Sequence, residues 1–342
     1  MLHLVTGGSG FLGSNIARRL HARGENVRVL DLWKADDLPE GIEFIEADIN
    51  NRVAVRQAMT NVEYVHHNVA LVPLAKAGSD YWKVNVDGTR VALEEAQRAE
   101  VKMFCHMSSS AIFGCPDDMP ITNNTPREPI EIYGRAKKAG EDLVFEAMKC
   151  GLKSSIVRPR TIIGTGRLGI FEILFDWIRD GANIYIIGSG NHPFQFAHVD
   201  DISDASINSC LLQKSGAFNI GALEFGNLYD DLKFLCEYAN TGSKVKSLPI
   251  GPTIGSLKLL DTLGLSPLSP WHYLTYHKPF FFDSMPAFND LGYSPAYSNR
   301  RMMTESYDWF LGHFDASKIK QGSSAHKKPV KQGILKLLKA IS

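Results

Sequence analysis

Tyr133 and Lys137 stand four residues apart in the stretch IYGRAKKAGEDL, which covers residues 132–143. The stretch is rich in helix-forming residues, so both side chains are expected on one face of a helix. Such a pair can be an ordinary surface contact that contributes roughly 0.2–0.5 kcal/mol. It can also be a proton-transfer pair, because a nearby ammonium favours the ionised form of a phenol. The choice between these interpretations depends on the strands, helices and motifs that surround the pair.

Short apolar segments alternate with helical patterns through the first half of the chain. This alternation predicts an α/β fold, a Rossmann-type doubly wound parallel sheet with a smaller, mainly C-terminal substrate-binding lobe. Helices are expected at 11–24, 80–99 and 131–149, and a further strand at 217–221. The other strands are expected at 2–6, 27–31, within 42–49, and at 62–67, 102–109 and 153–159.

The second half of the chain is less regular and contains helical segments broken by Gly and Pro. We expect a cofactor domain at 1–165 with a return near 195–221. A substrate-binding lobe is expected at 166–194 and 222–320. Residues 321–342 form a basic tail whose apolar side chains fall largely opposite its lysines. That tail could lie on a membrane surface, or dock on the body of the protein or on a partner subunit.

Composition narrows the class of protein. Lys plus Arg and Asp plus Glu both number 37, so net charge gives no indication of a nucleic-acid partner. The five cysteines are widely spaced and form neither a disulfide framework nor a CxxC pair. Reduced thiols and a cytoplasmic location are therefore expected. The sequence also shows no signal-peptide pattern and no apolar run of membrane-spanning length.

A glycine-rich turn follows the first expected strand. In VTGGSGFLGSN, Gly7 allows a tight turn, Gly10 allows a pyrophosphate to approach the backbone, and Gly13 allows the helix and the strand to pack closely. Asp31 ends the second strand, where a carboxylate can accept hydrogen bonds from an adenosine ribose and would repel a 2′-phosphate. These features predict a dinucleotide site that prefers NAD to NADP.

Two further segments fall at the carboxyl ends of expected strands, where ligands of open α/β sheets bind. Asp48 could reach the adenine edge or could cap a turn, and the residues leave both roles open. Asn68, Val69 and Ala70 follow the fourth strand. The histidines just before them have no carboxylate or cysteine at ligand spacing, so we expect no metal.

Together these motifs resemble the extended short-chain dehydrogenase/reductase family, over nearly the whole chain to about residue 315. The resemblance rests on TGGSGFLG, Asp31, ADI, NVA, NVDGT, SSSAIFG, YGRAK, VRP and HVDD, in this order. It implies that Tyr133 is the catalytic acid/base. Lys137 would lower its pKa and bind the nicotinamide ribose. Ser109, five residues before Gly114, would be the catalytic serine.

The expected cofactor is NAD, and the expected cofactor contacts combine the glycine turn, the strand ends and the helix that carries Tyr133. They are Gly7, Gly10, Phe11, Leu12, Gly13, Asp31, Asp48, Ile49, Asn68, Val69, Ala70, Tyr133, Lys137 and Arg158. Asn85 is expected to have a structural role. The resemblance also implies a homodimer that pairs through the helices near 80–99 and 131–149.

The substrate is less well indicated. Nucleotide-sugar epimerases of this type usually have a diphosphate-binding arginine where this chain has Phe194. The main hypothesis is an epimerase or oxidoreductase that acts on a small molecule, a nucleotide sugar for example. The alternative is a dehydrogenase of apolar alcohols, similar to 3β-hydroxysteroid dehydrogenases. The cations that could replace the missing arginine are Arg160, Arg167, Arg300 and Arg301.

Two other functions are disfavoured. Sugar-nucleotide dehydratases of the family carry an Asp–Glu pair after the catalytic Thr, whereas Ser110 and Ala111 follow Ser109 here and neither can transfer a proton. A non-catalytic NAD(P)-sensing protein would typically have lost the Tyr–Lys pair, which this chain keeps.

Overall fold

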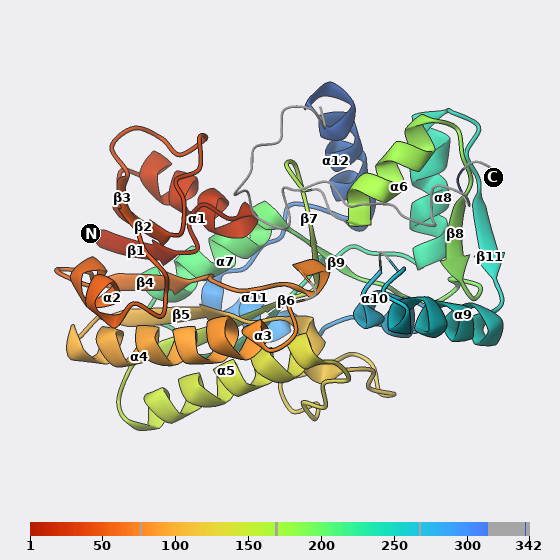
Figure 1. Cartoon of the computed structure of the whole chain (residues 1–342). Helices are drawn as coiled ribbons and strands as arrows, with labels where there is room; N and C mark the ends of the chain where they lie inside the picture. Colours follow the sequence, from red (N-terminus) through yellow and green to blue (C-terminus); the bar gives the residue numbers. More distant parts are fainter. Residues whose placement is uncertain (76, 168–169, 267, 314–338, 340–342) are drawn as a thin grey trace.

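The computed structural model describes residues 1–75, 77–167, 170–266, 268–313 and 339. Its centre is a sheet of seven parallel strands in the order β10-β6-β5-β4-β1-β2-β3 (Figure 1). The parallel, doubly wound sheet that the sequence predicts is confirmed. The strands are β1 (Leu2–Thr6), β2 (Asn26–Asp31), β3 (Glu43–Glu46), β4 (Tyr64–His67), β5 (Met103–Met107), β6 (Ser154–Pro159) and β10 (Gly216–Ile220).

Helices cover both faces of this sheet (Figure 1). One face packs on α1 (Phe11–Ala22), α7 (Val199–Leu211) and α11 (Met285–Leu291). The other packs on α2 (Arg52–Ala58), α4 (Gly88–Arg98) and α5 (Ile132–Lys149). Strands β4, β5 and β6 are buried along their whole length, as a parallel sheet covered on both faces requires. The chain reverses direction across the sheet between β1 and β4, which creates the ligand-binding crevice of such folds.

A second group of elements packs beside the sheet around an aromatic core (Figure 1). That core includes Phe171, Phe194 and Phe280 and also takes in Tyr133 of α5. Two parallel strand pairs contribute to it, β7 (Thr161–Ile163) with β9 (Phe196–His198) and β8 (Ile184–Ile187) with β11 (Val245–Leu248). The helices are α6 (Ile170–Arg179), α8 (Leu228–Ala239), α9 (Ile250–Thr262), α10 (Pro270–Thr275) and α12 (Asn299–His313).

Short helical segments complete the fold. They are η1 (Pro73–Ala75), α3 (Asp80–Trp82), the π-helical segment η2 (Lys83–Asp87) and η3 (Ser110–Phe113). The helix expected near 80–99 is therefore α3, η2 and α4 in succession. The expected amphipathic tail lies outside the described residues except for Lys339, whose Nζ donates to Asp176 of α6 at 2.6 Å.

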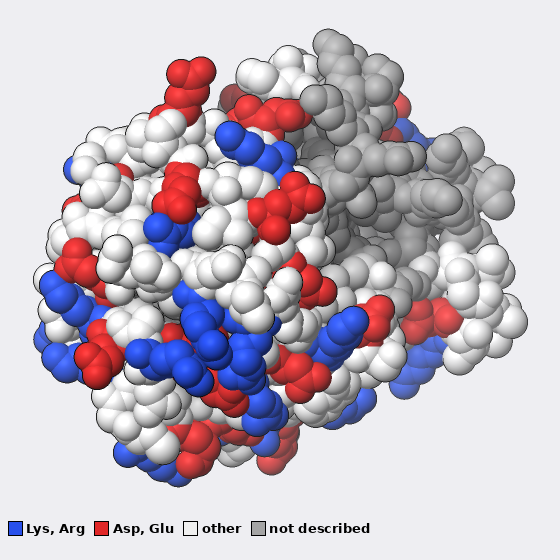
Figure 2. All heavy atoms as spheres, turned by 60° about the vertical axis from the view of Figure 1, so that its left-hand side comes forward, with Lys and Arg blue, Asp and Glu red and all other residues white. Residues whose placement is uncertain are grey.

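Charge on the molecule is mixed. On the face shown in Figure 2, basic and acidic side chains are interspersed over the N-terminal half of the fold. Arg52 and Arg56, for example, both pair with Glu95. Among the described residues, no helix is long and apolar enough to cross a membrane.

Buried histidines are an unusual feature of the central strands. His3 and His66 contact each other through their ring nitrogens at 3.1 Å, and His67 contacts the hydroxyls of Thr6 and Thr89. Burial lowers the pKa of His3 and of His67 to about 3. Both rings are therefore neutral in the folded protein at neutral pH. In the part of the chain that the structure describes, no group of three or more His, Cys, Asp or Glu is arranged to hold a metal ion.

These histidines predict an acid-sensitive fold. The unfolded chain takes up protons on His3 and His67 below about pH 6.5, whereas the folded protein does not. The free energy of unfolding should therefore fall with pH by up to about 1.4 kcal/mol per pH unit for each ring. Asp201, whose pKa burial raises to about 6, opposes this trend. Urea unfolding at pH 7.5 and pH 5.5 measures the difference.

His67→Gln is the matching variant, because its amide can still bond to Thr6 and Thr89 but cannot be protonated. Its stability should depend less steeply on pH than that of the wild type. An unfolding free energy that stays constant or rises on acidification would contradict the conclusion that His3 and His67 are neutral in the folded protein.

Candidate active site

Ser109, Tyr133 and Lys137 come together at the carboxyl end of β5. Ser109 precedes η3, and its hydroxyl lies near enough to the Tyr133 phenol to lower the pKa of that phenol. Lys137 lies one turn further along α5 and donates from Nζ to the carbonyl of Met107 at 2.8 Å. Tyr133 is 7% exposed and Lys137 3% exposed, so this is not a surface pair.

Local sequence explains why α5 starts at this point. Glu131 caps the helix by accepting from the backbone N–H groups of Tyr133 and Gly134 at 2.8 and 2.7 Å. A Cβ on Gly134 would lie only 2.5 Å from the carbonyl oxygen of Ala111. Glycine at 134 therefore allows α5 to approach the turn that carries Ser109. Sequence reasoning did not single out Gly134 or Glu131, although the Tyr–Gly dipeptide was visible.

Burial dominates the electrostatics of the three side chains. It raises the pKa of Tyr133 above its ordinary value, while the Ser109 hydrogen bond and the charge of Arg167 lower it. Burial also lowers the pKa of Lys137 to about 8, partly offset by Glu141. The expected effect of Lys137 on the Tyr133 pKa is not among the largest contributions. In this structure Tyr133 is a phenol at neutral pH, able to donate a proton.

The glycine turn forms a cradle for a phosphate group. Gly7 has φ +67°, and a Cβ there would lie 2.9 Å from the backbone nitrogen of Val69. A Cβ on Gly13 would overlap the carbonyl oxygen of Gly7. Gly10 is the N-cap of α1, and no side chain caps this helix, so its first amides face the turn. A helix N-terminus of this kind favours a phosphate, and Phe11 and Leu12 are its first residues.

Asp31 lies against this cradle at the end of β2. Its carboxylate accepts from the backbone N–H of Ser9 at 3.0 Å and from that of Leu32 at 2.7 Å. Burial raises its pKa, and these two hydrogen bonds lower it. The carboxylate is therefore held in a fixed position beside the turn, where a ribose could bind. The cradle and this carboxylate together fit a dinucleotide such as NAD.

The remaining expected cofactor residues lie at the same edge of the sheet. Asn68 donates its backbone N–H to Thr6, which places residues 68–70 beside the glycine turn. Ile49 is buried against Gly88 of α4. Asp48 is exposed and accepts from the backbone and side chain of Asn50, which is the turn-capping role. Contact of Asp48 with adenine stays a prediction.

Arg158 is bonded to side chains within the protein. It is 2% exposed, and its Nε and Nη2 each donate to the carboxylate of Glu141 at 2.8 Å. Nη1 donates to Asn123, and the guanidinium lies over the ring of Phe113. Three of its N–H groups are thus used within the protein. Contact of Arg158 with the cofactor stays a prediction.

Asn85 has the structural role that was expected. It lies in the π-helical segment η2 and is 1% exposed. Its side chain accepts from the backbone N–H of Leu71 at 2.8 Å and donates to the carbonyl of Leu71 at 3.0 Å. Asn85 thereby fixes the segment that follows Ala70.

The cations proposed to replace the missing arginine fall into two groups. Arg300 pairs with Asp231, and Arg301 lies over the ring of Tyr297 and donates to the carbonyl of Ala296. Arg160 and Arg167 are buried on the side of Tyr133 and the aromatic core. Phe194 is itself fully buried, and the guanidinium of Arg160 lies 4.9 Å from the centre of its ring.

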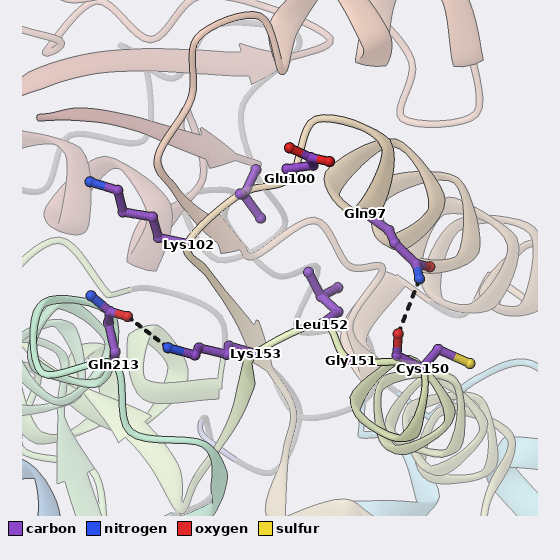
Figure 3. A pocket seen from close by; sticks show the side chains of 9 residues that line it. Gln97, Glu100, Lys102, Cys150, Gly151, Leu152, Lys153 and Gln213 are labelled. Carbon is purple, nitrogen blue, oxygen red and sulfur yellow. Dashed lines mark hydrogen bonds between the residues drawn. The ribbon is translucent and has the colours of Figure 1, made fainter.

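A surface pocket lies at the opposite edge of the sheet (Figure 3). Lys102 and Lys153, which line it, immediately precede β5 and β6, so the pocket is at the amino ends of these strands. Lys153 donates to Gln213, and Gln97 to the carbonyl of Cys150, across its wall (Figure 3). None of the proposed catalytic side chains lines it.

The close approach of α5 makes Gly134→Ala a sharp test of the site. The added methyl would collide with the carbonyl of Ala111 and should separate Tyr133 from Ser109. We expect turnover to fall at least about ten-fold and the free energy of unfolding to fall by roughly 1–3 kcal/mol. Gly255→Ala is the control, because a Cβ there meets nothing within 4 Å and alanine is the better helix former. If Gly134→Ala behaves like Gly255→Ala, the approach does not position the site.

The chain is similar in sequence and in fold to several known proteins. Protein y4nG of Sinorhizobium fredii is 45% identical over 336 residues, which is 98% of this chain and 85% of y4nG. Sterol demethylase protein B of Methylococcus capsulatus is 36% identical over 174 residues, 48% of this chain and about half, 52%, of that protein. The solved UDP-glucose 4-epimerase of Thermotoga maritima with UDP-glucose superposes with a TM-score of 0.76 at 25% identity, covering 91% of this chain and 99% of that one.

A family model matches the larger part of the chain. Residues 3–221, which contain the glycine turn, Asp31, Ser109, Tyr133 and Lys137, match the model described as NAD dependent epimerase/dehydratase family. With the parallel sheet and its glycine-rich crevice, this match shows that the chain belongs to the NAD-dependent epimerase/dehydratase family, within the extended short-chain dehydrogenases.

Proposed function

We propose that this NAD-dependent enzyme transfers hydride at a secondary alcohol or ketone carbon, with Ser109, Tyr133 and Lys137 as its catalytic residues. One observation carries the proposal. The phenol of Tyr133 is buried, Ser109 lies close enough to lower its pKa, and both are at the carboxyl edge of the sheet where the glycine cradle and Asp31 also lie. A surface tyrosine would have neither the partner nor the burial.

Each side chain has a role that follows from its chemistry. Ser109 holds the substrate oxygen by a hydrogen bond, and Tyr133 gives a proton to that oxygen or takes one from it. Lys137, fixed by the Met107 carbonyl, lies one turn beyond Tyr133 and presents its ammonium to the same region. Bound NAD supplies the hydride acceptor. Burial raises the pKa of Tyr133 and so favours the neutral phenol, which can donate a proton. Ser109 and the charge of Arg167 lower this pKa, which favours the phenolate needed for proton abstraction.

The substrate is proposed to be a small molecule of one of two classes. A nucleotide sugar that is epimerised is the main hypothesis, and the solved UDP-glucose 4-epimerase with 25% identity supports it. An apolar or lipid alcohol that is oxidised or reduced is the alternative. The aromatic cluster around Phe194, which includes Phe196, Tyr276 and Phe280, favours it, as does the similarity to sterol demethylase protein B.

Cofactor absorbance separates these classes. An epimerase returns its hydride and leaves NAD oxidised, whereas a dehydrogenase that oxidises an alcohol accumulates NADH with turnover. Stoichiometric NADH with a 3β-hydroxysteroid would support the alternative. Interconversion of UDP-glucose and UDP-galactose without net NADH would support the main hypothesis.

The remaining features are proposed on the same basis. The cofactor site would consist of Gly7, Gly10, Phe11, Leu12, Gly13, Asp31, Asp48, Ile49, Asn68, Val69, Ala70, Tyr133, Lys137 and Arg158. The sheet domain at 1–165 with its return near 195–221 would bind NAD, and the elements around the aromatic core would bind substrate. A homodimer formed through the segments near 80–99 and 131–149 and a cytoplasmic location complete the proposal.

Tyr133→Phe should reduce turnover by about 10²–10⁴-fold while leaving NAD affinity close to that of the wild type, since it removes one transferable proton and little else. Tyr81→Phe is the matched control. Its ring centre lies 6.0 Å from that of Tyr133, and its hydroxyl donates to the carbonyls of Val72 and Pro73. Steady-state kinetics should show most activity retained in Tyr81→Phe. Equal losses in the two variants would remove Tyr133 from the mechanism.

The position of Asp31 predicts tighter binding of NAD than of NADP, because a 2′-phosphate would meet a fixed carboxylate. Asp31→Asn keeps the shape of the side chain and removes its charge, so it should reduce the difference between the affinities for NAD and NADP. Calorimetric titration with both cofactors measures the two affinities. A wild-type protein that binds NADP as tightly as NAD would show that Asp31 does not meet the ribose.

A further inference from the structure

Two buried arginines near Tyr133 have no carboxylate partner among the described residues. Arg160 is 1% exposed and Arg167 8% exposed. The buried Arg158, by contrast, is paired with Glu141. Burying a guanidinium without a counter-charge is costly, and its charge is essentially permanent. Burial accordingly lowers the pKa of Arg160 to about 9 and that of Arg167 to about 10.

The contacts of Arg160 hold it in place and leave part of its fork unused. Nε donates to the carbonyl of Gln195 at 3.1 Å, and Nη1 donates to the hydroxyl of Ser110 at 3.0 Å. The guanidinium lies 4.0 Å from the ring centre of Phe280 and 4.9 Å from that of Phe194. Nη2 is buried and lacks a hydrogen-bond partner. Arg160 thus brings a positive charge directly onto Phe194, the position where the diphosphate-binding arginine was expected.

Arg167 has a similar arrangement. Nε donates to the carbonyl of Ile162 at 3.2 Å, and the guanidinium lies 5.6 Å from the ring centre of Phe11. Nη1 is buried and lacks a hydrogen-bond partner. Its charge acts on the phenols of both Tyr133 and Tyr276, and the charge of Arg160 also acts on Tyr276. Both guanidiniums therefore lie near the phenol of Tyr276, and Arg167 is also close to the proposed acid/base.

We propose that Arg160 and Arg167 bind an anionic oxygen group of the substrate, a carboxylate or a phosphate, close to the carbon that reacts. This inference rests on the proposed function, because it assigns the alcohol carbon to the neighbourhood of Ser109 and Tyr133. Ser110, which accepts from Arg160, directly follows Ser109 along the chain. A carboxylate or phosphate matches the planar fork of a guanidinium, and the aromatic rings hold that fork in position before the ligand arrives.

The anion would also supply the hydrogen-bond partners that Nη2 of Arg160 and Nη1 of Arg167 lack. Buried donors without partners are rare in folded proteins, and each orphaned N–H here belongs to a charged group. An anionic ligand satisfies both donors and neutralises the charge. A purely apolar alcohol would do neither.

Anion binding by the NAD-loaded protein tests the proposal without requiring turnover. The probes are sodium phosphate and sodium acetate, each compared with sodium chloride at equal ionic strength, with the unfolding temperature as the readout. Wild-type protein should be stabilised by at least one of the two anions. Arg160→Gln and Arg167→Gln should each weaken that anion's apparent affinity about ten-fold or more. Preference for phosphate or for acetate identifies the anionic group.

The controls separate this site from alternatives. Arg301→Gln removes an exposed arginine that also lies over an aromatic ring, and it should bind anions like the wild type. Tyr133→Phe should likewise keep the anion affinity, which distinguishes failure of this inference from failure of the proposed mechanism. If Arg160→Gln does not fold, Arg167→Gln still tests the pair.

Three results would overturn the inference. One is a wild-type protein that binds neither anion, and another is anion affinity unchanged in both glutamine variants. The third is a result showing that the arginines bind the pyrophosphate of NAD, because Arg167 lies near Phe11 of the glycine turn. If the anions stabilise the protein only in the absence of NAD and Arg167→Gln weakens NAD binding about ten-fold, the arginines bind the cofactor and not the substrate.

Discussion

The close approach of helix α5 to the turn after β5 is the constraint on which the proposed chemistry depends. A Cβ on residue 134 would lie only 2.5 Å from the carbonyl oxygen of Ala111, so glycine lets the helix start this close to Ser109. Glu131 then fixes the first turn of the helix through two backbone hydrogen bonds. Tyr133 points into the buried region between these features, and Lys137 follows on the same side of the helix.

Burial at this point sets the charge balance of the site. Lys137, Arg160 and Arg167 all have pKa values lowered by removal from water, and Tyr133 has a pKa raised by the same cause. A buried region with several cations and a neutral phenol is poised for anionic species, because each added negative charge is favoured there. The proposed substrate anion and the negative charge that develops on the reacting oxygen would both benefit from this excess. The cost of keeping these cations buried would be a loss of stability, a trade-off that is common at functional sites.

Sequence patterns predicted the parts of the structure that depend on local chain properties. Strand–helix alternation and the glycine turn specify β1, α1 and the crevice, since period and glycine spacing are read within a few residues. Tyr133 and Lys137 could be paired because the helix places residues four apart together. The stacking of Arg160 between Phe194 and Phe280 could not be predicted, because these residues lie far apart in the chain and meet only through tertiary packing. The pairing of Arg158 with Glu141 could not be predicted for the same reason.

The most direct measurement of the central claim is a crystal structure of the protein with NAD. The account predicts the pyrophosphate at the N-terminus of α1 beside Gly7 and Gly10, the adenosine ribose on the carboxylate of Asp31, and the nicotinamide beside Tyr133 and Lys137. The nicotinamide ribose should accept a hydrogen bond from Lys137, with Ser109 and Tyr133 both facing the space next to the nicotinamide ring. A nicotinamide that lies away from Tyr133, with α5 and the Ser109 turn unchanged, would contradict the account.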